Sequence, residues 1–179
     1  MVDNIFSGKE FAEEVKRCIS VFDTESDRGV VLVASSMIEE ALKNLIASYL
    51  LPPLNKGDEL LERGPLQNLN SRIQAAYRLG LIRKSVSDGL HAFRDMRNEF
   101  AHNIETCNFS DPKIIIKLDA IYKHSADISL LLDGYWPHDK EGGAIPTRLK
   151  FTLFISVLIS ALNFAQREVI AIQPLDLIN

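Results

Sequence analysis

The feature that most constrains the fold is an apolar stretch that runs from Phe151 to Ala165. It is shorter than the ~20 residues that a bilayer span requires. It also carries polar side chains, namely Thr152, Ser156, Ser160 and Asn163. We therefore expect a core helix rather than a membrane anchor. Because this helix is apolar nearly all round, other elements must cover it on both sides, which also favours a dimer.

The rest of the chain shows helical periodicity, and the alternation typical of strands is hard to find. A capping-box pattern at Ser7–Glu10 opens the first helix, and Pro52-Pro53 ends the second. Further start and stop signals predict helices over about 7–22, 27–50, 65–80, 84–103, 110–132 and 147–171, and a loop over 134–146. The predicted fold class is all-α, a bundle of six to seven helices with no significant sheet.

Length, charge and cysteine content narrow the class of protein. With 179 residues, of which 46% are hydrophobic, the chain fits one domain over residues 1–179 with a buried core. A net charge of −4 argues against a general electrostatic grip on DNA. Cys18 and Cys107 lack the neighbours that a zinc site needs, and the first residues do not resemble a signal peptide. We expect a cytoplasmic protein with free thiols and no bound metal.

One run of residues points to chemistry: Arg97-Asn98-Glu99-Phe100-Ala101-His102, near a predicted helix end. Asn98 and His102 are four residues apart and share a helix face, and the long Arg97 side chain can reach the same place. Such a set suits a phosphodiester, because an imidazole can move a proton and a guanidinium can hold phosphate by two hydrogen bonds. Asn98 would orient the imidazole or the substrate. Arg97, Asn98 and His102 are the candidate catalytic residues, and they require no metal or cofactor.

Basic residues gather around this run although the whole chain is acidic. Between residues 72 and 102 the sequence contains six basic residues and three acidic ones. Arg72, Arg78 and Arg94 are the candidates for a phosphate-binding face. An ordinary solvated helix face has the same composition, so both interpretations stay open.

A structural role for the same run is an equal alternative. Arg97 paired with Glu39 or Glu40 of the second predicted helix would tie two helices together. His102 would then only cap the carbonyl groups at the end of its helix.

The spacing Arg97-Asn98-x-x-x-His102 resembles the R-x4-6-H signature of HEPN domains, helical modules often found as metal-independent ribonucleases. In that superfamily a polar residue commonly follows the arginine, and an acidic partner often lies where Glu39 or Glu40 stands. Two copies usually meet so that both motifs line one cleft. The resemblance implies a HEPN-like fold, a homodimer and, as one candidate function, an endoribonuclease or toxin that uses Arg97 and His102 on RNA.

A longer resemblance covers about residues 30–132 and over half of the chain. The segments that carry it look like the mannitol operon repressor family, and they are Gly64–Leu66, Ser71–Ile73, Ala76–Ile82 and Arg94–His102. That family is named for transcriptional repression, yet this sequence shows no short turn that presents a basic recognition helix. The resemblance implies a regulator that acts through a protein partner rather than by sequence-specific DNA binding. A ribonuclease, or a module that binds a nucleotide at the basic face, are the alternatives.

Overall fold

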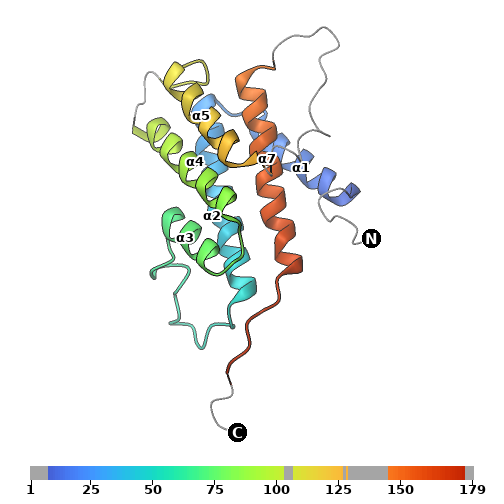
Figure 1. The fold of residues 1–179 in the computed structure, drawn as a ribbon, viewed down its shortest axis with the longest axis vertical. Helices are drawn as coiled ribbons and strands as arrows, with labels where there is room; N and C mark the ends of the chain where they lie inside the picture. Colours follow the sequence, from blue (N-terminus) through green and yellow to red (C-terminus); the bar gives the residue numbers. More distant parts are fainter. Residues whose placement is uncertain (1–7, 103–106, 127, 129–144, 176–179) are drawn as a thin grey trace.

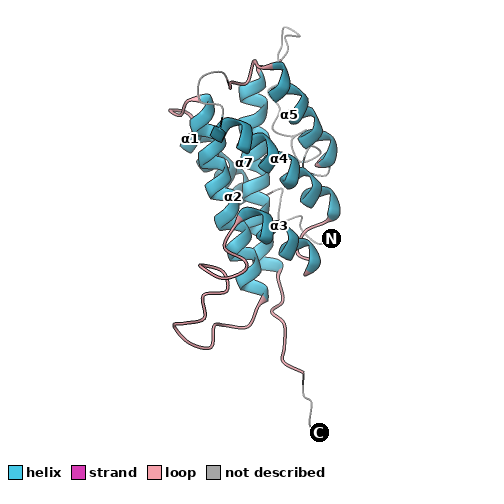
Figure 2. Ribbon diagram, turned by 90° about the vertical axis from the view of Figure 1, so that its left-hand side faces the viewer, coloured by secondary structure: helices cyan, strands magenta, loops and turns pink. Residues whose placement is uncertain are grey.

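The computed structural model describes residues 8–102, 107–126, 128 and 145–175. Within these ranges the chain forms six α-helices and one short 3-10 helix, without any strand (Figure 1, Figure 2). This confirms the predicted all-α class. The helices are α1 (Lys9–Phe22), α2 (Asp27–Tyr49), α3 (Leu69–Arg78), α4 (Lys84–His102), α5 (Pro112–His124), α7 (Thr147–Ala165) and the 3-10 helix η1 (Gln166–Glu168).

The apolar stretch forms α7, which packs along α1 and α2 (Figure 1). Every side chain from Phe151 to Leu162 is buried. The phenylalanine rings of α7 also meet rings from three helices, namely Phe11 of α1, Phe93 of α4 and Tyr122 of α5. By length and composition alone the segment Thr147–Glu168 could cross a membrane, but 72% of its most apolar window is buried inside the fold. That degree of burial is typical of a core helix.

Helical periodicity decides which faces of α1 and α2 are buried. In α1 the four apolar residues at helical spacing are all buried, and they are Phe11, Val15, Cys18 and Phe22. In α2 the buried arc is wider, because α1 and α7 as well as α3 and α4 pack on this helix. Val33 and Met37 of the same helix are only half-buried, at the border of the core.

Capping residues fix several helix ends. Ser26 caps α2 by accepting a hydrogen bond from the Gly29 amide at 3.0 Å. At the end of α3 the Gly80 amide donates to the Tyr77 carbonyl, and the Leu81 amide donates to the Ala76 carbonyl. This is a Schellman motif. It places Gly80 at a φ of +74°, where a glycine has no steric penalty.

Two predicted helix starts are wrong. The N-cap of α1 is Gly8, without a side-chain capping bond, so the predicted capping box does not start this helix. Its serine, Ser7, lies outside the described residues. α3 begins at Leu69 rather than at Pro65, because the Asn68 side chain accepts a hydrogen bond from the Ser71 amide at 3.0 Å and caps the helix there.

The C-terminal parts of two predicted helices also differ from the structure. α5 ends at His124, because Ser125 leaves the helical conformation with φ −103° and ψ 41°, and Ala126 and Ile128 are helical again after this interruption. The last helix ends with η1 at Glu168 rather than at residue 171. The chain then becomes extended, and the Ile172 amide donates to the Tyr49 carbonyl at 2.9 Å, which satisfies an acceptor at the end of α2. Residues 129–132 of the predicted fifth helix, and the predicted loop up to residue 144, lie outside the described residues.

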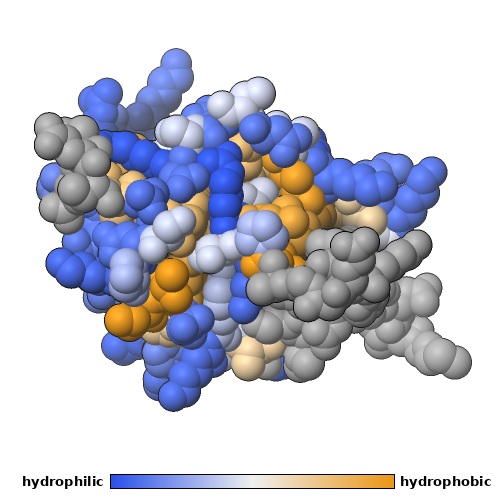
Figure 3. Space-filling model, turned by 90° about the horizontal axis from the view of Figure 1, so that it is seen from above, coloured by the Kyte–Doolittle hydropathy of each residue, from blue (hydrophilic) through white to orange (hydrophobic). Residues whose placement is uncertain are grey.

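Apolar side chains reach the described surface in separate places. Seen from above, the end of the molecule is mainly hydrophilic, with apolar areas between polar side chains (Figure 3). The most exposed large apolar residues lie in three separate segments: Leu54 in the connector after α2, Ile116 in α5, and Ile170 and Leu175 after η1. They do not single out one face for a second copy, and the homodimer stays a prediction.

Candidate functional site

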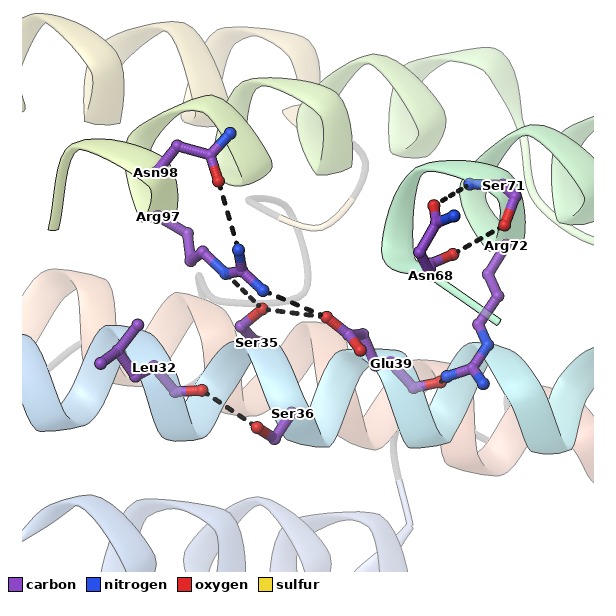
Figure 4. A network of polar contacts seen from close by, with 9 residues as sticks. All are labelled: Leu32, Ser35, Ser36, Glu39, Asn68, Ser71, Arg72, Arg97 and Asn98. Carbon is purple, nitrogen blue, oxygen red and sulfur yellow. Dashed lines mark hydrogen bonds and ion pairs between the residues drawn. The ribbon is translucent and has the colours of Figure 1, made fainter. Parts of the chain in front are cut away.

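Arg97 extends from α4 across to α2 (Figure 4). Its Nε donates to Ser35 Oγ at 3.2 Å, and its Nη2 lies 3.5 Å from Glu39 Oε1. Ser35 and Glu39 are four residues apart in α2 and therefore share the face toward α4. Of the two acidic residues suggested by the sequence, Glu39 lies beside Arg97. Glu40 lies on the exposed side of α2 and pairs with Lys43 at 3.3 Å, which corrects its assignment as a partner of Arg97.

The contact between Arg97 and Glu39 is only half-buried. Their side chains are 34% and 27% exposed, and an ion pair of this exposure contributes about 0–1 kcal/mol to stability. Among the described residues the guanidinium donates to Ser35, Asn98 and Glu39. A guanidinium has five N–H groups, so two of them stay available. The contact joins α2 to α4 without closing Arg97 off from a ligand.

Asn98 and His102 differ in their relation to Arg97. The Asn98 Oδ1 accepts a hydrogen bond from Arg97 Nη1 at 3.2 Å, so the two neighbouring side chains form one unit. His102 is the last residue of α4 and is exposed. The structure therefore brings Arg97, Asn98 and Glu39 together and leaves His102 one helical turn away, at the end of α4.

Arg72 has a structural role, which corrects its assignment to a phosphate-binding face. The residue is only 6% exposed. Its guanidinium donates to the carbonyl groups of Glu39 at 3.0 Å, Leu61 at 2.8 Å and Leu66 at 2.9 Å. These bonds fasten the connector after α2 onto α2 and α3. All three nitrogens of the Arg72 guanidinium are therefore engaged with backbone rather than with the surface.

The other two arginines of the predicted face have different surroundings. Arg78 is exposed in the last turn of α3. Arg94 lies one turn before Arg97 in α4, where it donates to Asn70 Oδ1 of α3 and to Asp95 at 3.0 Å. The Nε of Arg94 is buried without a hydrogen-bond partner in the described part of the chain.

Arg94 and Arg97 both line a cavity of about 260 Å³ between α2, α3 and α4. The remaining lining residues are Glu39, Asn98 and the start of α3, namely Gln67, Asn68, Leu69 and Asn70. Neither His102 nor Arg78 lines it. The asparagines of α3 were not singled out from the sequence. Asn68 directly before the apolar Leu69 is an N-cap signal, and it would have placed this helix start beside α4.

The cysteines do not belong to this site. Cys18 is buried under α7 with its Sγ 3.8 Å from Ser160 Oγ, and burial raises the pKa of its thiol. Burial also raises the pKa of Cys107, which is half-buried. A raised pKa lowers the thiolate fraction, so neither thiol is activated as a nucleophile. Across the described ranges no group of three or more His, Cys, Asp or Glu side chains is placed to hold a metal ion.

Comparison with solved structures shows a similar fold in another protein. The fold resembles that of a possible transcriptional regulator, YggD from Shigella flexneri, with a TM-score of 0.53 and 15% sequence identity. The match covers 86% of this chain and 97% of that chain. At this level of identity the likeness concerns the fold. Comparison with curated proteins gives no match.

Comparison with protein families gives a match over most of the chain. The model of the mannitol repressor family, MtlR, matches residues 19–170. The match begins within α1 and includes α2, the cavity and the whole of α7. It therefore extends beyond the resemblance over about 30–132 at both ends. Because it covers well over half of the sequence, the chain belongs to the mannitol repressor family.

Proposed function

We propose that the protein is a transcriptional regulator of the mannitol-repressor type that acts through protein contacts and does not itself read DNA. Membership of that family over residues 19–170 carries the proposal. The net charge of −4 supports the second part, because DNA affinity arises mainly from lysine and arginine side chains that neutralise phosphates.

The packing of α4 also supports action without direct DNA reading. α4 follows α3 after a short turn, which is the order of a helix-turn-helix motif. A recognition helix must offer an exposed polar face to the major groove. However, α4 packs on α2, α3 and α5, and its exposed residues in the described structure are Lys84, Asp95 and His102, which are spread over its whole length. This helix does not present the required face.

Selection from random DNA duplexes with the purified protein tests the DNA-binding part. We expect no enriched sequence, and only weak binding that is lost as salt is raised. Enrichment of a defined operator by the protein alone would overturn this part. Deletion of the gene with transcript profiling tests the regulatory part. We expect a defined set of transcripts to rise and to return on complementation, whereas an unchanged profile contradicts regulation.

One observation favours a second candidate, a metal-independent endoribonuclease. Arg97 and Asn98 line a cavity, and His102 is exposed one turn further along the same helix. The ribonuclease predicts RNA cleavage in EDTA that is lost in Arg97→Ala and in His102→Ala while both variants keep their helix content and Tm. Arg63→Ala, at an exposed position outside the cavity, is the matched control. The regulatory proposal predicts no cleavage by the wild-type protein.

A further inference from the structure

The polar side chains around the cavity between α2, α3 and α4 have their acceptor oxygens already engaged. Asn98 Oδ1 accepts from Arg97, and Asn68 Oδ1 accepts from the Ser71 amide (Figure 4). In the same way, Asn70 Oδ1 accepts from Arg94. Guanidinium groups and backbone amides only donate, so the three side-chain amides must present their oxygens to them. The NH2 group of each asparagine is therefore not used in these three hydrogen bonds.

The two arginines add to this surplus of donors. Arg97 keeps two N–H groups beyond its three bonds, and the buried Nε of Arg94 has no partner in the described structure. Among the residues that the structure describes, Glu39 is the single carboxylate that lines the cavity. It already faces both Arg97 and the Ser35 hydroxyl. The lining holds two guanidiniums and one carboxylate, and Arg94 also pairs with Asp95 beside it at 3.0 Å. The two arginines therefore offer the site several N–H donors, while each of them has a carboxylate within reach.

The size and arrangement of the cavity limit what it can hold. Its volume of about 260 Å³ is below the ~300–1,000 Å³ of pockets for drug-sized molecules. The donors come from two sides, with the arginines on α4 and the asparagines mainly at the start of α3. A carboxylate has two oxygens along one edge, whereas a phosphate monoester has three terminal oxygens that can meet donors from both helices.

We propose that this cavity binds a small phosphate monoester, held by Arg94 and Arg97 from α4 and by the side-chain amides of α3. We assign the ligand the role of an effector of the regulator. The effector role rests on the regulatory function proposed above, whereas the binding itself does not.

Isothermal titration of the full-length protein with glycerol 3-phosphate tests the binding, with glycerol, acetate and inorganic phosphate as comparison ligands. We expect saturable binding of glycerol 3-phosphate, competition by inorganic phosphate, and no binding of glycerol or acetate. Arg94→Gln is expected to raise the Kd at least about tenfold, because it removes a charge-assisted hydrogen bond. Absence of saturable binding by the wild-type protein, or equal binding of acetate, would overturn the assignment.

Two further variants separate binding from folding and from overall charge. Asn70→Asp keeps an acceptor for Arg94 and places a carboxylate in the cavity, so we expect it to stay folded and to lose binding. Arg63→Gln makes the same charge change as Arg94→Gln at a side chain that is 81% exposed and outside the cavity, and we expect a wild-type Kd. Binding by Asn70→Asp, or an equal loss in Arg63→Gln, contradicts the site.

A short oligoribonucleotide and the transcript profile complete the test. Binding of the oligoribonucleotide without binding of glycerol 3-phosphate would overturn the proposal in favour of an RNA site. If Arg94→Gln loses binding and changes the transcripts that respond to gene deletion, both proposals are supported. If the wild-type protein binds glycerol 3-phosphate but deletion of its gene leaves the transcript profile unchanged, only the regulatory function is contradicted. If deletion changes the transcript profile but the wild-type protein binds no glycerol 3-phosphate, only the cavity assignment is contradicted.

Discussion

Two arginines, Arg72 and Arg97, contact the same residue of α2, Glu39, through different groups. Arg72 donates to the backbone carbonyl of Glu39, whereas Arg97 lies against its carboxylate (Figure 4). The first guanidinium is buried and bonded at all three nitrogens. The second is about one-third exposed and keeps spare donors. We infer that Arg72 acts mainly on stability, and that Arg97 is the one available to a ligand.

The first prediction concerns Arg72. Arg72→Ala is expected to lower the free energy of unfolding by about 2–4 kcal/mol, because the buried Arg72 side chain and its three hydrogen bonds to the carbonyls of Glu39, Leu61 and Leu66 are lost. Arg78→Ala removes the same side chain from an exposed position of α3, and it is expected to change the free energy by about 0.5 kcal/mol or less. Urea denaturation measures both, and equal losses would contradict the structural role of Arg72.

At the scale of elements, α4 packs closely against the C-terminal end of α5 at Gly89. A Cβ added at Gly89 would overlap the hydroxyl of Ser125, which is buried, and would lie 3.2 Å from its Cβ. Helix propensity alone favours alanine over glycine by about 0.5–1 kcal/mol, so the sequence suggests a weak point in α4. The packing explains why glycine is needed there.

Gly89→Ala is therefore expected to destabilise the protein by about 1–2 kcal/mol, since the crowding outweighs the gain in helix propensity. Thermal unfolding monitored by circular dichroism measures the change in Tm. Adding Ser125→Gly to the same background removes the opposing side chain and is expected to restore part of the loss. A higher Tm in Gly89→Ala alone would contradict this prediction, because it would show that the end of α5 can shift to make room for the methyl group without loss of stability.

The docking of α1 on α7 predicts a pH dependence. Glu14 of α1 accepts hydrogen bonds from Arg17 at 2.6 Å and from Asn163 of α7 at 3.1 Å. The hydrogen bond from Arg17, helped by that from Asn163, lowers the pKa of Glu14 below its ordinary value of 4.5 although burial opposes this. Because the folded pKa is the lower one, the ionised carboxylate stabilises the fold above the ordinary pKa. This contribution is lost as the pH falls through the folded pKa.

We expect the free energy of unfolding to fall more steeply between about pH 5 and pH 3 in the wild-type protein than in Glu14→Gln. Urea denaturation at several pH values measures both slopes. Glu13→Gln is the matched control, because Glu13 lies on the exposed side of α1 and its side chain is 62% exposed. Parallel curves for the wild-type protein and Glu14→Gln would contradict the assigned role.

For the whole molecule, one hydrophobic cluster contains buried residues from every α-helix that the structure describes. Such a cluster predicts cooperative unfolding of residues 1–179 as one domain. Near-UV and far-UV circular dichroism are expected to give coincident transitions. Phe154→Ala, in the middle of α7, should lower the free energy of unfolding by about 3–5 kcal/mol, and both transitions should move together. Two separate transitions would contradict the single-domain prediction.

The sequence predicts local features better than contacts between distant segments. The order of the helices and the buried face of α1 follow from helical periodicity, which is a local pattern. The end of η1 and the burial of Arg72 depend on contacts with Tyr49 and Glu39, which are far away in the sequence. In the same way, the sequence suggests Glu39 or Glu40 as the partner of Arg97 without deciding between them, and the bond between Arg94 and Asn70 requires knowing how α3 lies on α4.

The position of α7 in the chain has a consequence for biosynthesis. α7 packs on α1 and α2, and its rings meet those of α4 and α5. All of these helices are translated before it. Until residues 147–165 have left the ribosome, their apolar faces lack a main packing partner, and nascent chains with exposed apolar surface are prone to aggregate or to bind chaperones. The dependence of the nascent chain on chaperones should therefore end late, when α7 emerges.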